Sequence, residues 1–155
     1  MNIGDKIPEV LGIDQDGKEI KASDYRGRKL VLYTYPKANT PGCSAEACSL
    51  QEHKAELAAA GYDIVGVSRD SQAAQKRFAE AKGLDFPLIA DTDTTLLQEL
   101  GAWGEKTNYG RTTMGILRTT YLVDEDGCVT HIFTPKQIKT KIHATQILTY
   151  LAENK

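Results

Sequence analysis

Two of the three cysteines, Cys43 and Cys48, lie five positions apart, and Cys43 directly follows the triplet Thr-Pro-Gly of residues 40–42. A mostly apolar run precedes this stretch and an Ala-rich run follows it, so Cys43 is expected where a strand ends and a helix begins. Unpaired backbone N–H groups and the positive end of the helix dipole stabilise an anion at such a position. The pattern therefore indicates a thiolate at Cys43, and with it nucleophilic or redox chemistry.

The residues just before Cys43 suit the same boundary. Proline is tolerated at the first positions of a helix and cannot continue a central strand, which agrees with Pro41 at this point. Thr40 can serve as the N-cap of the helix or turn its hydroxyl toward the sulfur. The alternative, open on these local features, is a plain N-cap at Thr40 and a small buried hydrophobic residue at Cys43.

The five-residue spacing limits how the two cysteines can react with each other. On an α-helix it separates the Cα atoms by roughly 8 to 9 Å and the side chains by ~140° around the axis. A disulfide requires Cα atoms closer than about 7 Å. We therefore expect a Cys43–Cys48 bond only after the first turns of the helix unwind. A helix that starts with Pro-Gly is suited to such local opening.

Two other uses of the cysteine pair are disfavoured. With His53 the cysteines form the pattern C-x4-C-x4-H, but successive steps of ~140° on one helix point the three side chains apart. No second cysteine cluster completes a tetrahedral zinc site. The C-x-x-C motif of thioredoxins and disulfide isomerases is absent as well. We expect no metal and no other cofactor.

Length and composition are typical of a globular domain. The 155 residues, 41% hydrophobic and 26% charged, predict one domain spanning 1–155 that needs no disulfide to fold. A net charge of −2 with both signs interspersed argues against nucleic acid or a membrane as a partner. The amino terminus shows no secretory signal, so we expect a cytoplasmic protein. In that reducing compartment a close cysteine pair is more often catalytic, redox-active or metal-binding than a permanent disulfide.

Hydrophobic periodicity and turn residues divide the rest of the chain into strands and helices. The predicted elements are hairpins at 11–23 and 117–133, buried strands at 29–36, 62–68 and 86–91, and helices at 44–60, 71–83, 94–101 and 138–154. Residues 102–115 are predicted to be irregular. This order implies an α/β fold of the thioredoxin-like class, with a central mixed sheet, helices on both faces and an N-terminal β-hairpin.

The residues 36–43 carry a resemblance to a known family. Their pattern P-x-x-x-T-x-x-C resembles the signature of peroxiredoxins, and Glu46 extends it as C-x-x-E. The C-x4-C spacing from Cys43 to Cys48 is similar to the Q-type branch, the bacterioferritin comigratory proteins. The similarity runs through nearly the whole chain, including the start, "FPLIAD", and the stretch "GAWGEKTNYGRTTMGILRTTYLVDEDG".

The resemblance implies a thiol peroxidase with a thioredoxin-like fold. Cys43 would be the peroxidatic cysteine, attacking hydrogen peroxide or an organic hydroperoxide as a thiolate and becoming a sulfenic acid. Cys48 would resolve this acid to an intramolecular disulfide, which thioredoxin or a similar dithiol protein would reduce by exchange. Relatives of this branch are frequently monomeric, so a monomer is expected.

The resemblance also implies supporting residues around Cys43. The hydroxyl of Thr40 would bond to the thiolate and the peroxide, and Pro36 would shield the pocket from water. Arg118, at the start of a late strand, would lie over the sulfur and stabilise the charge that develops as the O–O bond breaks; the alternative is a solvated arginine at a strand end. Glu46 would orient Arg118, or would be an exposed glutamate serving the helix dipole.

Other readings of the chain remain open. A dithiol-disulfide oxidoreductase would use Cys43 and Cys48 without peroxide, and a redox-regulated binding or holdase module would use the opening of the helix to expose apolar surface. We expect Cys128 to be an incidental thiol. No role is assigned to the three histidines at positions 53, 131 and 143, because the sequence fixes no partner for any of them.

Overall fold

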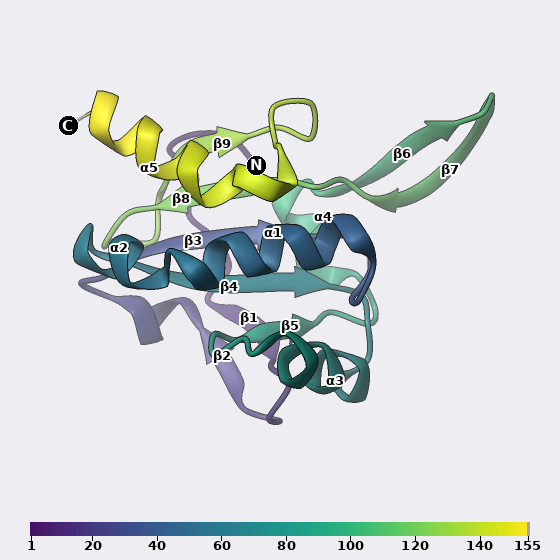
Figure 1. The fold of residues 1–155 in the computed structure, drawn as a ribbon, viewed down its shortest axis with the longest axis horizontal. Coiled ribbons are helices and arrows are strands. Elements are labelled where there is room, and N and C mark those ends of the chain that lie inside the picture. Colours follow the sequence, from purple (N-terminus) through teal and green to yellow (C-terminus); the bar gives the residue numbers. More distant parts are fainter. Residues whose placement is uncertain (155) are drawn as a thin grey trace.

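The computed structural model describes residues 1–154, apart from the side chain of Asn108. Its centre is a five-stranded sheet in the order β5-β4-β3-β8-β9 (Figure 1). The strands are β3 (Lys29–Thr34), β4 (Tyr62–Ser68), β5 (Leu88–Ala90), β8 (Thr120–Val123) and β9 (Val129–Phe133). The first three run parallel, whereas β8 pairs antiparallel with both β3 and β9. The predicted mixed sheet is confirmed.

The central strand β3 shows why this sheet lies between two layers. Val31 and Tyr33 belong to one buried cluster and Leu30 and Leu32 to the other. Because successive side chains of a strand point to opposite faces, a continuous apolar run buries both faces. The apolar run of β3 therefore requires cover on both sides of the sheet.

Helices and a hairpin supply that cover. The helices are α1 (Pro41–Glu52), α2 (Lys54–Ala59), α3 (Gln72–Lys82), α4 (Thr95–Leu100) and α5 (His143–Glu153), with short 3-10 turns at Ala22–Tyr25 and Thr140–Ile142. One face of the sheet carries α1, α2, α3 and α5. The other carries α4 and the hairpin of β1 (Val10–Ile13) and β2 (Glu19–Lys21). Helices on both faces and the N-terminal hairpin are thus confirmed (Figure 1).

The helix predicted over 44–60 is two helices, with a break at His53. The backbone there leaves the helical region, with φ −106° and ψ 14°. The imidazole Nδ1 of His53 lies 2.9 Å from the carbonyl oxygen of Ser49, which the backbone N–H of His53 reaches at only 3.3 Å. A side chain that competes for a carbonyl of the helical ladder is a recognised cause of helix distortion.

The stretch 102–115 is not irregular, and the prediction for it was wrong. It forms most of an antiparallel ribbon of β6 (Trp103–Asn108) and β7 (Arg111–Ile116) that projects from the body of the molecule (Figure 1). Tyr109 and Gly110 make its turn with φ of 51° and 79°. The first four residues of β7 are exposed, so the ribbon lacks the alternation of apolar and polar residues by which strands are predicted. A bulky residue at positive φ also departs from the usual turn signal.

The C-terminal helix begins later than the predicted 138–154. A 3-10 turn over Thr140–Ile142 comes first, and α5 starts at His143. Ile138 packs against the core without being helical. Because its spacing to Ile142 fits one turn of a helix, the sequence pattern placed the helix start too early. None of the helices in the described part of the chain has the length and apolar composition needed to cross a membrane.

Candidate active site

Cys43 lies in the first turn of α1, where it was predicted. The helix begins at Pro41, and Thr40 is its N-cap residue with extended backbone, φ −84° and ψ 155°. The preceding loop is anchored by Asp70, whose Oδ2 accepts a hydrogen bond from the Ala38 N–H at 2.8 Å. Cys43 is only 2% exposed. The sulfur is therefore held at the positive end of a helix and shielded from bulk water. Because burial disfavours a charged sulfur, a thiolate at this position requires a cation nearby.

Thr40 occupies the predicted N-cap position, but its hydroxyl does neither of the two things predicted. It donates to the carbonyl oxygen of Lys37 at 2.7 Å, and the helix has no side-chain cap bond. Asn39 sits between them in the left-handed region with φ 63°, which folds the chain into a turn and brings the Lys37 carbonyl to Thr40. The hydroxyl still has lone pairs with which it can accept a further hydrogen bond.

Arg118 supplies the cation beside the sulfur. Its Nη2 lies 3.4 Å from Cys43 Sγ. The segment that carries Arg118 is fastened to the end of β3 through Thr34, whose Oγ1 donates to the Leu117 carbonyl at 2.8 Å and accepts from the Thr119 N–H at 3.0 Å. The expected position of Arg118 over the sulfur is present, and the alternative of a solvated strand-end arginine is excluded. Arg111, the arginine that precedes Arg118 in the sequence, is exposed at the start of β7.

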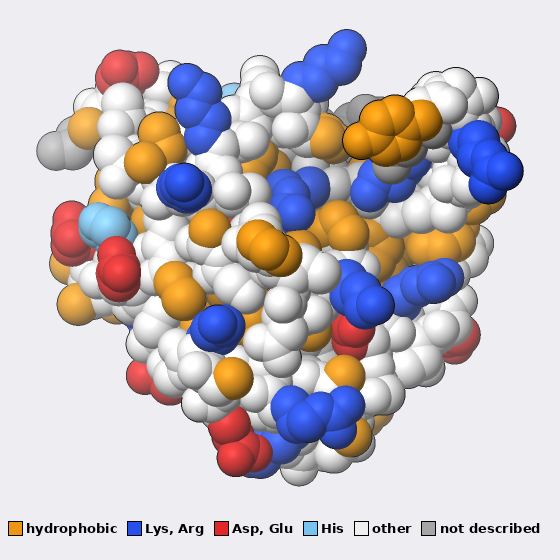
Figure 2. Space-filling view, turned by 45° about the vertical axis from the view of Figure 1, so that its right-hand side comes forward, with side chains coloured by type: hydrophobic (Ala, Val, Ile, Leu, Met, Phe, Trp, Pro, Cys, Tyr) orange, Lys and Arg blue, Asp and Glu red, His pale blue; other side chains and the backbone are white. Residues whose placement is uncertain are grey.

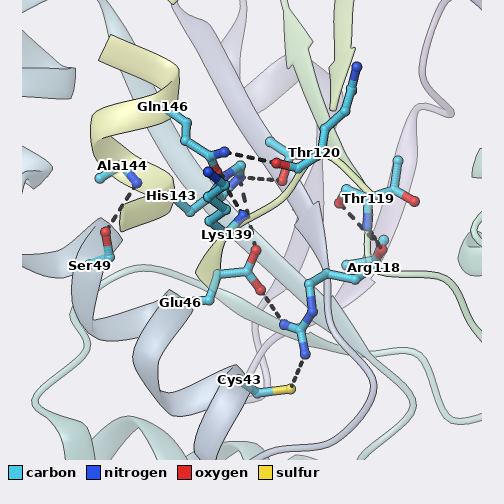
Figure 3. A network of polar contacts seen from close by, with 12 residues as sticks. Cys43, Glu46, Ser49, Arg118, Thr119, Thr120, Lys139, His143, Ala144 and Gln146 are labelled. Carbon is cyan, nitrogen blue, oxygen red and sulfur yellow. Dashed lines mark hydrogen bonds and ion pairs between the residues drawn. The ribbon is translucent and has the colours of Figure 1, made fainter. Parts of the chain in front are cut away.

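Glu46 holds the opposite side of the same guanidinium (Figure 3). Arg118 Nη1 donates to Glu46 Oε1 at 2.6 Å, and the Glu46 side chain is fully buried. The predicted pairing is present, and an exposed first-turn glutamate is excluded. Burial opposes the charge of Arg118, but Glu46 and Cys43 more than offset it, and the pKa of Arg118 is raised. Arg118 is therefore a fixed cation that bridges Cys43 and Glu46.

The carboxyl of Glu46 titrates near neutrality. Burial raises its pKa from 4.5 to about 7, and the neighbouring Arg118 only partly opposes this shift. Desolvation disfavours the charged form of a carboxyl group, whereas a hydrogen-bonded cation favours it. Desolvation is the stronger effect here, so Glu46 can hold a proton at a pH where an exposed glutamate has lost it.

His143 is a member of this polar cluster that sequence reasoning missed. It is fully buried, with Nε2 2.8 Å from Thr120 Oγ1 and 3.9 Å from Glu46 Oε2, while Nδ1 lies 3.0 Å from Gln146 Oε1. A helical pattern that runs through His143 and Ile147 places both on one face, and both are buried. That pattern was the available signal, because a histidine on an apolar face needs polar partners.

Among the described residues, Arg118 bonds to the Cys43 sulfur, whereas the remaining predicted site residues, Pro36 and Cys48, do not. Pro36 follows β3 and is partly exposed. Cys48 is partly exposed on the intact helix α1, and all three cysteines are free. Cys128 follows the C-terminal end of β8, whereas Arg118 precedes its N-terminal end. In the part of the chain that is described, no three His, Cys, Asp or Glu side chains are grouped so as to hold a metal ion.

The surface around this end of the molecule is rich in positive charge. The amino-terminal end of α1, at the right of Figure 1, turns toward the viewer in Figure 2. Lys and Arg side chains are scattered among hydrophobic ones over this face (Figure 2). Such a surface favours the approach of anions to this end of the molecule.

Comparison with known proteins places the chain in a family. The AhpC/TSA family matches residues 3–132. Peroxiredoxin Bcp of Escherichia coli strain K12 is 39% identical over 154 residues, covering 99% of this chain and 97% of that protein. A putative peroxiredoxin bcp of Haemophilus influenzae is 38% identical over 151 residues, covering 97% and 96%.

Solved structures agree with this placement and confirm the thioredoxin-like fold. A mutant PrxQ of Xylella fastidiosa superposes with a TM-score of 0.88 at 31% identity, covering 99% of this chain and 97% of that one. The bacterioferritin comigratory protein of Xanthomonas campestris, described for its alkyl peroxide reduction activity, has a TM-score of 0.84 at 30% identity; the match covers 97% of this chain and 99% of that one. The chain belongs to the AhpC/TSA family, and within it to the Bcp/PrxQ peroxiredoxins, which are thiol peroxidases.

Proposed function

We propose that the peroxidase reaction of this chain takes place at Cys43. The observation that carries the proposal is the buried bridge in which Arg118 contacts both the Cys43 sulfur and Glu46. A dithiol-disulfide oxidoreductase has no need of a guanidinium held by a buried carboxyl above one of its sulfurs. A peroxidase does, because negative charge moves from sulfur to oxygen during the reaction.

The first step oxidises the sulfur by two electrons. The Cys43 thiolate attacks the terminal oxygen of a hydroperoxide, the S–O bond forms, and the O–O bond breaks. The leaving hydroxide or alkoxide takes up one proton and becomes water or an alcohol, while Cys43 becomes a sulfenic acid. Arg118 donates hydrogen bonds to the oxygens as charge develops on them. Because the Thr40 hydroxyl already donates to Lys37, it can accept the O–H of the incoming peroxide and orient it.

The second step joins the two cysteines. The Cys48 thiolate attacks the sulfenic sulfur, and hydroxide leaves as water after protonation, giving a Cys43–Cys48 disulfide. Residues 41–52 form an intact helix in the structure, on which the two Cα atoms are roughly 8 to 9 Å apart. The first turns of α1 must therefore unwind before the bond can form. A thioredoxin-like dithiol then reduces the disulfide by exchange and is itself oxidised.

Further features of the proposal concern substrate, assembly and place of action. The Xanthomonas relative supports organic hydroperoxides as substrates beside hydrogen peroxide. Pro36, partly exposed at the loop before α1, would limit water at the site. Both cysteines and Arg118 belong to one chain, so a monomer suffices for the cycle. We expect the cycle to run in the cytoplasm, where reduced dithiols are available.

A coupled assay tests this proposal. The purified protein is mixed with hydrogen peroxide or cumene hydroperoxide, thioredoxin, thioredoxin reductase and NADPH, and NADPH loss is followed. We expect rapid turnover that Cys43→Ser abolishes and that the matched variant Cys128→Ser leaves unchanged. Turnover no faster than that of free cysteine at the same thiol concentration would refute the peroxidase, and turnover that survives Cys43→Ser would refute the assignment of Cys43.

A further inference from the structure

One peptide group in the loop before α1 is held from both sides. Its N–H, that of Ala38, donates to Asp70 Oδ2 at 2.8 Å. Its carbonyl oxygen, that of Lys37, accepts from the Thr40 hydroxyl at 2.7 Å. The C=O and N–H of a trans peptide group point in opposite directions within one rigid plane. Asp70, which fixes the N–H, therefore also fixes the direction in which the Lys37 carbonyl points.

The direction of this carbonyl determines how the Thr40 hydroxyl is oriented. A hydroxyl has one hydrogen and two lone pairs. Because the hydrogen of Thr40 points to the Lys37 carbonyl, the lone pairs lie on the other side of Oγ1. If the peptide group rotated, the hydroxyl would be free to turn and its lone pairs would have no fixed direction. The Asp70 contact thus bears on the one part of Thr40 that can accept from a substrate.

The turn that brings Lys37 and Thr40 together needs support from outside. Asn39, between them, has φ 63°. Residues other than glycine adopt this left-handed conformation uncommonly, and they keep it where surrounding contacts impose it. Asp70 belongs to the segment that follows β4 and is 32 positions away from Ala38 along the chain. It supplies such a contact.

Asp70 is itself fastened to the central sheet. Its Oδ2 accepts a second hydrogen bond, from Ser68 Oγ at 2.6 Å, and its backbone N–H reaches the same Oγ at 3.2 Å. Ser68 is the last residue of β4 and is fully buried. The carboxylate that holds the loop is therefore fixed to the end of a sheet strand.

The donor and acceptor roles behind Ser68 are fixed as well. Gln75 Nε2 donates to Ser68 Oγ and to the Ile89 carbonyl, both at 2.9 Å. A carbonyl oxygen can only accept, so the amide nitrogen of Gln75 must face it, and the Ser68 hydrogen is left for Asp70. Gln75 Oε1 accepts from the Tyr35 hydroxyl. Tyr35, Ser68 and Gln75 are all fully buried, and a buried network whose members are satisfied is rigid.

We propose that Asp70 is a positioning residue for the peroxide: through the Lys37–Ala38 peptide group it orients the Thr40 hydroxyl, whose free lone pair receives the O–H of the substrate. The inference rests on the proposed reaction at Cys43. Asp70 acts as a hydrogen-bond acceptor and not through its charge, because a carboxylate near a thiol disfavours the thiolate.

Two reagents for the same thiol test this role. In a Cys48→Ser, Cys128→Ser background Cys43 is the single thiol, and stopped-flow mixing with trapping follows its oxidation to sulfenic acid by hydrogen peroxide. Methyl methanethiosulfonate is the comparison, since it has no O–H or N–H for Thr40 to accept. Asp70→Ala should slow the peroxide reaction about tenfold and change the other reaction less than about threefold. Equal slowing with both reagents would overturn the proposal.

A conservative variant separates the hydrogen bond from the charge. Asp70→Asn keeps an oxygen that can accept from both Ala38 and Ser68, so its peroxide rate should stay within about threefold of the background rate. A rate as low as that of Asp70→Ala would contradict the proposal. The matched control is Asp63→Ala, which removes an exposed carboxylate near the start of the same strand β4 and should alter neither reaction.

Ser68→Ala provides a milder test if Asp70→Ala does not fold. It removes one of the two donors to the Asp70 carboxylate and leaves the Ala38 bond in place. We expect a loss of about threefold with hydrogen peroxide and none with methyl methanethiosulfonate. A loss that does not distinguish the two reagents would count against the role of Asp70.

A double-mutant cycle shows whether Asp70 acts through Thr40. Thr40→Val should slow the peroxide reaction at least as much as Asp70→Ala does. Adding Asp70→Ala to Thr40→Val should slow it by a further factor of less than about two. If the two full effects multiply, Asp70 acts independently of Thr40 and the proposal fails. Absence of sulfenic acid when both residues are intact would instead overturn the proposed function itself.

Discussion

The two cysteines of α1 lie on the same helix but in different surroundings. Cys43, in the first turn, is 2% exposed and is contacted by Arg118 from the segment before β8. Cys48 is partly exposed and free. A side chain from another element, Arg118, bonds to the sulfur of Cys43, whereas the structure shows Cys48 as a free thiol on the middle of the helix. The comparison shows that tertiary contacts distinguish Cys43 from Cys48; in the proposed cycle, the helix between them sets the order of the two steps.

The largest expected effect comes from exchanging the two sulfurs for oxygen one at a time. Cys43→Ser should lower peroxide consumption by about a thousandfold or more, because the nucleophile is lost. Cys48→Ser should still consume about one equivalent of peroxide and then stop at the sulfenic acid. Stopped-flow consumption followed by mass spectrometry distinguishes the two. An undiminished thioredoxin-dependent turnover of Cys48→Ser would break the distinction between the positions.

The next effect concerns the contact that Cys43 has and Cys48 lacks. Arg118→Met should slow sulfenic acid formation by roughly a hundredfold to a thousandfold, the cost typical of removing a donor from a developing oxyanion. Reduction of the disulfide by thioredoxin should change only a few-fold, since Arg118 has no role there. Arg111→Met, in the exposed part of β7, is the matched control and should affect neither step. Equal slowing of both steps by Arg118→Met would remove its assignment to peroxide attack.

A smaller effect tests the buried charge behind Cys43. The folded-state pKa of Glu46 is raised from 4.5 to about 7, so between these values the folded protein holds a proton that the unfolded chain has lost. Stability should therefore be full below pH 4.5 and fall as pH rises toward 7. Because the shift is near 2.5 pH units, 7 minus 4.5, this loss amounts to at most about 3 kcal/mol.

Urea unfolding of reduced protein at pH 5 and pH 8 measures this loss. Glu46→Gln cannot ionise, so its stability should change less between these two pH values than that of the unaltered protein. Glu80→Gln, an exposed change on α3, should behave like the unaltered protein. The same pH slope in Glu46→Gln would show that Glu46 is not the group that titrates.

The smallest effect concerns how firmly the helix between the two cysteines is held. Ser49 Oγ accepts a hydrogen bond from the Ala144 N–H at 3.1 Å and so ties α1 to the start of α5. Ser49→Ala leaves this buried N–H unpaired, which should destabilise the reduced protein by about 1 to 2 kcal/mol. If unwinding limits disulfide formation, the variant should also form the Cys43–Cys48 bond several-fold faster after one equivalent of peroxide. Slower formation would show that this tie does not restrain the helix.

The same contrast explains what could be predicted from the sequence. The strands around Val31 and Ile64 follow from hydrophobic periodicity, and the helix boundary at Pro41 follows from the tolerance of proline at a helix start. Both are local properties. The ribbon of β6 and β7 was missed because its exposed residues carry no such period. The partners of His143 could not be predicted, because the contact with Glu46 depends on how α5 packs against α1. For Thr40 the predicted helix position is present, but its hydroxyl neither caps the helix nor bonds to the sulfur. Asn39 turns the loop, so that the Thr40 hydroxyl donates to the Lys37 carbonyl.

The proposed cycle requires α1 to unwind before Cys43 and Cys48 can join. Hydrogen exchange with peptide-level mass spectrometry, on reduced protein and on protein oxidised by one equivalent of peroxide, tests it most directly. We predict an intramolecular Cys43–Cys48 disulfide and a loss of amide protection in residues 43–48, with the strands β3 and β4 unchanged. A Cys43–Cys48 disulfide with full protection over those residues, or a disulfide formed through Cys128, would contradict the account.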